Sequence, residues 1–466
     1  MTHLKKFSYS ETSGRWMIYS SAFITFFISS FILSDAILTY KQFLPYFEFT
    51  GILLCLSLFA LFLGNISGRV IYNKIKFLRT LNVTLSLLLT AVTALLYYKH
   101  YLFSYEFDNF SLYIKNRFLV YPVFAAPMLI AGFINTYLLK VSCGDFVDEK
   151  NLLNQYHISI FTAIAAAIFL NMAVHHWGIN PVYYPLLPVC LGFVLTIFSS
   201  RLTLTYLPEV LLAKHYLDDD ARVEETYVHR DDLLFTYSNF SFIIIYIFLG
   251  FIVLIKFYGN IYYYGLLYTA SMLAAMTMGY SFGRFSRQSF WYVYSEMLYP
   301  VFFTLSLILL YQFESIADLR AGIIFISIPG LIFGFSLSST VFNIFSKYDH
   351  QRRFNIIQFT LFIIPLPILA ASGFLTFTSM VFFIILYIIA FINLVIPGIF
   401  LFNLKINYLK KTAYMLIALL FIPAIILFHL YFKIPVDEKP FLMNTGNYEV
   451  LKAINFNMPY IAEKDE

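Results

Sequence analysis

The sequence is dominated by uninterrupted apolar stretches, each long enough to form a helix across a lipid bilayer. A helix crosses the hydrocarbon in about 20 residues, and stretches such as 17–40 and 47–68 have that length with very few charges. They do not alternate between apolar and polar residues, which favours helices over a membrane β-barrel. A spanning helix satisfies its own backbone hydrogen bonds. The chain is therefore predicted to be an all-α polytopic membrane protein.

The composition supports a lipid environment and disfavours several other classes of protein. Only 12% of the residues are charged, whereas soluble proteins carry about 25%. The net charge of +5 is spread over short loops, where basic residues orient membrane proteins, so nucleic acid is not an expected partner. No HExxH, P-loop or nucleophile elbow occurs. We therefore expect no catalytic residues, no metal site and no cofactor, and not an enzyme.

Thirteen spans are expected, with the N-terminus inside. They lie near 17–40, 47–68, 78–98, 118–141, 157–176, 181–200, 234–257, 261–283, 290–312, 320–345, 355–377, 380–404 and 412–432. The basic loops "RVIYNKIKFLR", "RFSRQ", "KYDHQRR" and "LKINYLKK" then fall on the cytoplasmic side, as the positive-inside rule requires. The expected location is a bacterial inner membrane, with the tail outside.

The expected spans group into two bundles. The predicted organisation is a cytoplasmic N-terminus (1–16), a six-helix bundle (17–200), a cytoplasmic linker (201–233), a second six-helix bundle (234–405), an extra helix (412–432) and a polar tail (433–466).

Several short motifs occur twice, in the same order. "GNISGR" at 64–69 returns as "GYSFGR" at 279–284, and "APMLIAGF" at 126–133 returns as "IPGLIFGF" at 328–335. "ISIFT" at 158–162 matches "IIQFT" at 356–360 more weakly. Because matching spans are six apart, both halves insert in the same orientation. This pattern predicts a parallel repeat about an axis along the membrane normal.

With these motifs the sequence resembles the major facilitator superfamily (MFS), in which a G-x-x-x-D-R/K-x-G-R/K loop follows span two and is often echoed after span eight. Here the aspartate position is glycine in both copies. The resemblance implies two six-helix bundles and a role of this motif in the cytoplasmic gate. The alternative to a gating role is that the glycines only pack helices together and the arginines only set the membrane topology. The motif residues are Gly64, Gly68, Arg69, Gly279, Gly283, Arg284 and Arg287.

A narrower resemblance concerns the membrane module of proteins that fuse an MFS-like region to a spermidine-synthase-like domain. It is carried by Gly283-Arg284 followed by Glu296, and by "HWGINPVYY" at 176–184. The tail 433–466 is too short for that enzyme domain and has no glycine-rich loop. It could serve as a docking segment for a protein partner.

Ionisable residues inside spans are costly and are therefore functional candidates. Asp35 lies about 7 Å from the outer end of its span, and Glu296 about 9 Å from the cytoplasmic end, at about 1.5 Å per residue. Each is a candidate for binding the solute or coupling ion; an interfacial, hydrated position is the alternative. Interhelical hydrogen bonding or an interfacial position explains the remaining polar residues, which are Asn135, Asn171, Asn343, Asn393, His175 and His176.

Two functions remain open on the sequence alone. The first is a secondary transporter that moves an unidentified small solute by alternating access. The second is a non-transporting membrane module that anchors or regulates a partner such as an aminopropyltransferase-like enzyme.

The odd number of spans predicts that the tail is exterior. A cysteine introduced as Asn444→Cys should therefore react with a membrane-impermeant thiol reagent in intact cells. The unsubstituted chain serves as the control. Protection of the new thiol in intact cells, together with reaction after lysis, would mean an even number of spans.

Overall fold

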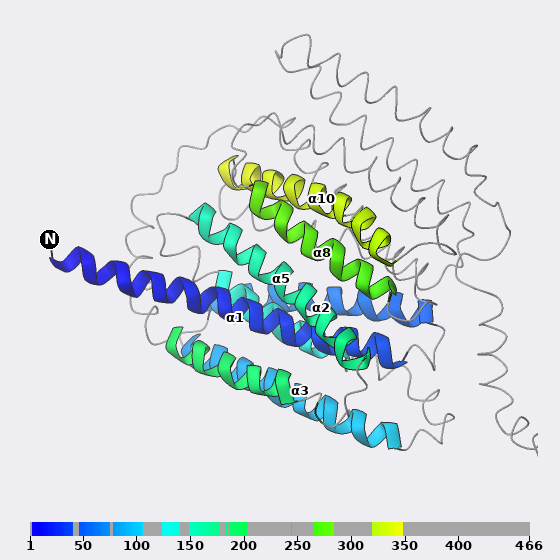
Figure 1. Cartoon of the computed structure of the whole chain (residues 1–466). Coiled ribbons are helices and arrows are strands. Elements are labelled where there is room, and N and C mark those ends of the chain that lie inside the picture. Colours follow the sequence, from blue (N-terminus) through cyan, green and yellow to red (C-terminus); the bar gives the residue numbers. More distant parts are fainter. Residues whose placement is uncertain are drawn as a thin grey trace, which may run out of the picture. The chain divides into compact units, whose positions relative to one another are not determined.

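The structure of the chain is a computed structural model. It describes residues 2–40, 46–74, 78–105, 124–139, 149–176, 183, 186–202, 244, 264–283 and 319–347. All extended elements within these residues are α-helices (Figure 1). The all-α expectation is confirmed for this part of the chain. The expected spans 290–312, 355–377, 380–404 and 412–432 lie outside it, as do the span 234–257 except for residue 244, nearly all of the expected linker 201–233, and the expected tail 433–466.

Each described helix overlaps one of the predicted spans. They are α1 (Thr2–Tyr40), α2 (Tyr46–Lys74), α3 (Leu78–Tyr105), α5 (Glu149–His176), α8 (Tyr264–Gly283) and α10 (Leu319–Lys347), with two shorter helices, Phe124–Leu139 and Leu186–Leu202.

Two helices begin earlier than the sequence predicted. α1 begins at Thr2 rather than at residue 17, and α5 begins at Glu149 rather than at residue 157. Hydropathy finds the part of a helix that suits hydrocarbon. The backbone hydrogen bonds do not need an apolar side chain, so they continue through the polar residues before it.

The chain divides into two compact units. One contains 1–36 and 52–228, and the other contains 37–51 and 229–466. The first unit holds most of α1 and α2, together with α3, α5 and the two shorter helices. The second holds α8 and α10.

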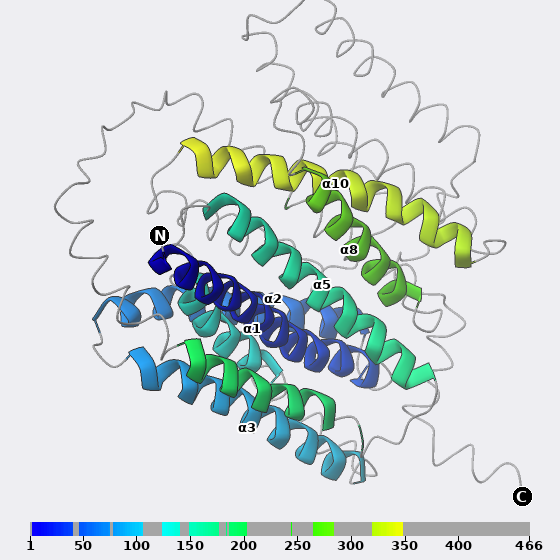
Figure 2. The ribbon, with the colours of Figure 1, turned by 60° about the vertical axis from the view of Figure 1, so that its left-hand side comes forward.

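α1 is the central helix of the first unit. Of its apolar segment Gly14–Leu38, 89% is buried in the protein, compared with 28% for Ile52–Ile71 of α2 and 33% for Asn154–Val174 of α5. Two views of the ribbon both place α1 between α3 and α5 (Figures 1 and 2). The surrounding helices therefore shield α1 from lipid.

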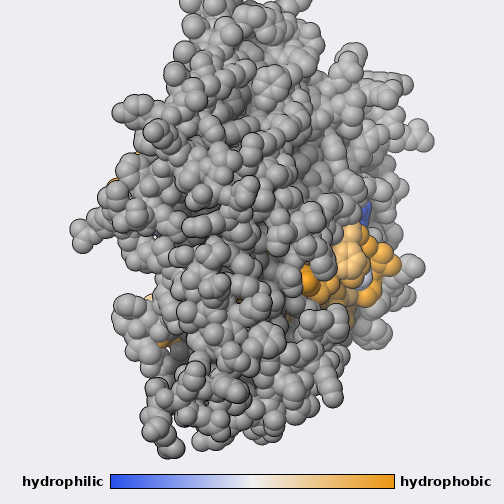
Figure 3. Space-filling view, turned by 90° about the vertical axis from the view of Figure 1, so that its right-hand side faces the viewer, coloured by the Kyte–Doolittle hydropathy of each residue, from blue (hydrophilic) through white to orange (hydrophobic). Residues whose placement is uncertain are grey.

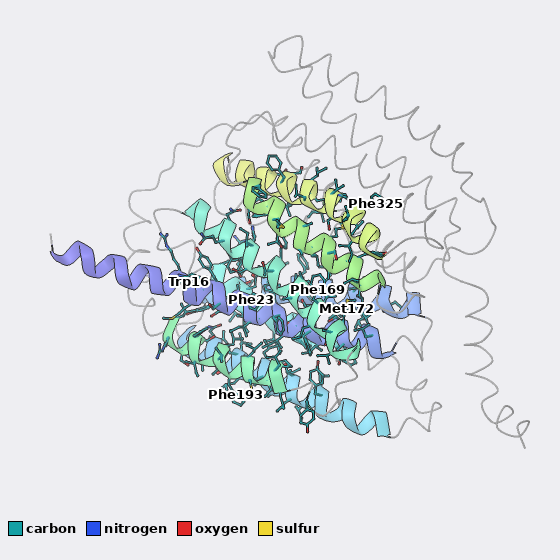
Figure 4. All side chains as sticks on the ribbon, in the orientation of Figure 1. Trp16, Phe23, Phe169, Met172, Phe193 and Phe325 are labelled. Atoms are coloured by element: carbon teal, nitrogen blue, oxygen red, sulfur yellow. The ribbon has the colours of Figure 1, made fainter. Side chains whose placement is uncertain are left out.

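The outer helices present large apolar side chains outward. Leu95 of α3 is 61% exposed and Phe193 of helix 186–202 is 57% exposed (Figure 4). In the second unit, Met278 and Ile324 are similarly exposed. The described surface visible in Figure 3 is mainly hydrophobic. Such a surface would be a liability in water but matches the hydrocarbon of a bilayer.

Many hydroxyl groups bond to their own helix. On α1, Thr25 Oγ1 donates to the Ser21 carbonyl at 2.7 Å, and Ser29 Oγ donates to the Thr25 carbonyl at 2.9 Å. The same pattern occurs on α8, where Ser271 donates to the Leu267 carbonyl. A hydroxyl bonded four residues back needs no partner from another helix. Short polar residues can therefore occupy these apolar spans.

Candidate functional site

The first copy of the repeated glycine motif lies at a close contact between α2 and helix 124–139. A Cβ atom on Gly64 would collide with the carbonyl oxygen of Leu129. In return, a Cβ on Gly132 would collide with the Leu61 carbonyl oxygen and lie 2.9 Å from the Asn65 nitrogen. Only glycine fits where two helix backbones touch in this way. The motif is therefore, at least, a packing motif for small residues in lipid.

The second copy builds the same contact between α8 and α10, which lie side by side in both views (Figures 1 and 2). A Cβ on Gly279 would collide with the Leu331 carbonyl oxygen. A Cβ on Gly334 would collide with the Met276 carbonyl oxygen and lie 2.7 Å from the Tyr280 nitrogen.

The two contacts correspond residue by residue. Aligning the repeated motifs places Gly64 on Gly279 and Gly132 on Gly334. The partner carbonyls correspond as well, with Leu129 on Leu331. Each unit therefore contains the same helix pair, held by the same backbone contact. The repeat read from the sequence is present in the packing of the described helices.

The glycine at the position of the family aspartate also lies in this contact. A Cβ on Gly68 would be 3.2 Å from the Thr136 Cβ, and a Cβ on Gly283 would be 2.6 Å from the Ser338 Cβ. Thr136 and Ser338 occupy matching positions in the repeat. A carboxylate side chain could not enter the second position without moving α10. The absence of the aspartate thus has a steric reason there.

The arginines of the motif are described only in part. Arg69 lies on α2 and is partly exposed. Arg284 and Arg287 lie outside the described residues, as does Glu296. A gating role for the motif stays a prediction.

A buried hydrogen-bond network adjoins the first glycine contact. Asn135 Nδ2 donates to Asn65 Oδ1 at 2.8 Å, and Thr136 Oγ1 donates to the Asn65 carbonyl oxygen at 3.0 Å. The Tyr156 hydroxyl donates to Asn135 Oδ1. All four residues are buried. The network links α2, helix 124–139 and α5.

The sequence analysis anticipated only part of this network. It assigned Asn135 to interhelical hydrogen bonding, which is confirmed. It did not single out Asn65, although this residue lies inside the repeated motif, or Tyr156. With 37 tyrosines in the chain, no sequence signal marks the one that reaches an asparagine on another helix.

Asp35 lies near the end of α1 and is 5% exposed. One turn of the same helix is held by Asn171 of α5, whose Nδ2 donates to the Phe31 carbonyl oxygen and to Ser34 Oγ, both at 2.6 Å. Figure 4 labels Met172, which follows Asn171 on α5, and Phe169, two residues before it. The expected interhelical bonding of Asn171 is confirmed. Asp35 is thus buried beside an α1–α5 contact rather than set at the protein surface.

The remaining polar candidates are not described at the level of side chains. His175 and His176 are in the last turn of α5, and Asn343 is on α10, without a described side chain. Asn393 lies outside the described residues.

Comparison with known proteins gives a structural likeness without a sequence family. No protein-family profile matches the chain, and no curated protein matches it. Among solved structures, it is similar to a crystal structure of a point mutant of the nucleoside transporter NupG, with 12% identity and a TM-score of 0.49. The match covers 84% of this chain and 100% of that one. What the chain does must be inferred from its own residues and contacts.

The glycine contacts predict an order of stability among variants. Gly64→Ala and Gly279→Ala each place a methyl group against a backbone carbonyl, which cannot move away, and should destabilise by about 1–3 kcal/mol. Gly68→Ala meets a side chain at 3.2 Å and should cost less. The loss of stability is measured as the decrease in the thermal unfolding midpoint of each purified variant in detergent. Equal unfolding midpoints for all three variants would contradict the close backbone contact at Gly64 and Gly279.

The hydrogen-bond network predicts an effect of removing one hydroxyl. Tyr156→Phe should destabilise the protein by about 0.6 kcal/mol, the average for side-chain hydrogen bonds between membrane helices, and by at most about 1.7 kcal/mol, because Asn135 Oδ1 loses a donor. Tyr183→Phe is the matched control, since Tyr183 is 61% exposed. Unfolding in detergent measures the stability of both variants. Equal stability of the two would show that the Tyr156–Asn135 hydrogen bond does not stabilise the protein.

Proposed function

We propose that the chain is an MFS-like secondary transporter that moves a small solute by alternating access. The observation that carries the proposal is the repeated glycine contact, which gives each of two compact units the same helix pair. Two equivalent bundles are the element that alternating access requires, because one bundle rocks against the other around a site near the bilayer midplane. The proposed bundles are 17–200 and 234–405.

The buried polar side chains of α1 are consistent with a solute path inside the protein. Of the three described helices that are long and apolar enough to span a membrane, α1 is the most buried in the protein. It carries Asp35, and an ionisable residue inside a membrane protein usually marks a solute or ion path. The buried polar residues of α1 are Ser21, Thr25, Ser29, Ser30, Ser34 and Asp35.

The second candidate is a membrane module that anchors a partner through the tail 433–466. The glycines at the position of the motif aspartate favour it, because they remove the charge pair expected of a working gate. A module of this kind would keep the packing between helices but would not rock one bundle against the other.

The test separates solute binding from movement. Solutes that raise the unfolding midpoint of the purified protein in detergent identify ligands, because binding to the folded state stabilises it. The same solutes are then followed in counterflow, with the protein in vesicles preloaded with unlabelled solute. If the protein transports the solute, radiolabelled solute added outside should accumulate inside the vesicles. If the ligands bind but do not cross the membrane, the membrane-module function is supported instead.

Glu296 is the proposed proton-coupling residue of the second bundle. The matching position in the repeat is Leu81, so this carboxylate is an addition to one half. Glu296→Gln should abolish uptake driven by a pH gradient and leave counterflow and expression intact, because exchange of solute needs no net proton movement. Asp218→Asn in the expected linker is the control. If uptake driven by a pH gradient is unchanged in Glu296→Gln, Glu296 does not couple transport to protons.

A further inference from the structure

One buried asparagine of the first unit has no hydrogen-bond partner for its side chain. Asn82 of α3 is 0% exposed, and neither its Nδ2 nor its Oδ1 is hydrogen-bonded within the part of the chain that the structure describes. Asn65 and Asn135 are also buried, but their amides are bonded through both the nitrogen and the oxygen. A buried amide that has lost its water and gained no partner destabilises the conformation that buries it.

The helix that carries Asn82 makes a close contact with helix 186–202. The two helices lie side by side in both views (Figures 1 and 2). Ser86 Oγ and Ser199 Oγ are hydrogen-bonded across them at 2.8 Å. A Cβ on Gly192 would be 2.3 Å from Thr90 Oγ1. The contact is therefore tight over at least two turns of α3.

Asn82 lies on the turn of α3 directly before this contact. Ser86 Oγ donates to the Asn82 carbonyl oxygen at 2.9 Å. Along α3 the contact proceeds from Ser86 to Thr90 while its partners proceed from Ser199 back to Gly192, so the two helices are antiparallel. Asn82 is thus on the side of the contact where helix 186–202 ends.

Both helices end close to the buried amide. α3 begins at Leu78 and the other helix ends at Leu202. Asn82 and Ser199 are therefore within about 6 Å of a helix end, at about 1.5 Å per residue. The topology predicted from the sequence places this end on the cytoplasmic side. Water can reach the amide as soon as the two helices separate there.

We propose that the helix ends 78–86 and 199–202 separate reversibly, and that the unpaired amide of Asn82 promotes this opening. The amide is unsatisfied while the contact is closed and hydrated while it is open, so it lowers the free energy of the open state relative to the closed one. The bond between the two serines and the glycine contact favour closure.

The opening has a place in the proposed transport function. Helix 186–202 is the last expected span before the linker 201–233, which joins the two bundles. Release of the end of this helix allows the linker to follow when one bundle rocks against the other. This coupling rests on the proposed transport function, whereas the opening itself does not.

The opening is measured by hydrogen–deuterium exchange of the full-length protein in detergent, where no transport occurs. Backbone amides near the start of α3 exchange when this end opens. Asn82→Leu removes the unpaired amide, so exchange of the amides at 82–90 should slow by about tenfold. Asn82→Ala, which adds no bulk, serves if Asn82→Leu does not fold. Asn135→Leu is the matched control and should not slow exchange, because the amide that it removes is bonded.

A disulfide across the contact assigns the effect to this opening. Ser86→Cys with Ser199→Cys puts two sulfur atoms where the oxygens are 2.8 Å apart, which is within reach of a disulfide bond. The pair is made in a chain whose three native cysteines are replaced by serine. Oxidation should slow exchange at 82–90, and reduction should restore it. Adding Asn82→Leu to the oxidised protein should slow exchange no further.

Two results would overturn the proposal. One is exchange at 82–90 that is as fast in Asn82→Leu as in the wild type. The other is exchange there that is equally fast in the oxidised and reduced double-cysteine protein, because this end then does not open.

Counterflow tests the link to transport separately. Oxidation of the double-cysteine protein should reduce counterflow, and reduction should restore it. Counterflow that the disulfide leaves unchanged would exclude the link. If the wild type shows no counterflow with any ligand but Asn82→Leu slows exchange, the opening is supported and the transport function is not.

Discussion

Direct contact between helix backbones is the interaction on which the described packing depends. In lipid there is little hydrophobic gain when two apolar helices associate, so van der Waals contact must provide the stability, and it requires close approach. Gly64 with Gly132, and Gly279 with Gly334, provide that approach in two separate units. The glycines allow the two helix backbones of each pair to touch.

The two units reinforce this shared contact by different means. In the first, Asn65 and Asn135 bond across it. Their counterparts in the repeat are Tyr280 and Leu337, both buried. In the second unit the glycine contact is longer, because a Cβ on Gly330 would lie 2.6 Å from the Met272 carbonyl oxygen. The shared contact therefore has an added amide bond in the first pair and an added glycine in the second.

The position of α1 connects this packing to the proposed function. A helix that carried Asp35 on a lipid-facing surface would be unstable in the membrane. Enclosing α1 among helices of its own unit removes that difficulty and gathers the polar groups inside the protein.

The sequence by itself determined the helices, the lipid environment and the repeat. Apolar length and doubled motifs are local properties, so the spans 261–283 and 320–345 could be predicted within a few residues of α8 and α10. Asp35 could be marked as a candidate because a carboxylate in an apolar stretch is unusual in itself. The sequence erred at the starts of α1 and α5, where helical hydrogen bonding continues past the apolar residues.

Only the tertiary structure decided which polar residues meet. Asn65, Asn135 and Tyr156 are on three helices, and no spacing along the chain shows that their side chains converge. Asn171 looked like any interhelical asparagine until its two donors were seen to be used and its oxygen left over. The sequence determines which groups lipid cannot tolerate alone, while the rotation and distance of the packed helices decide which partner each one finds.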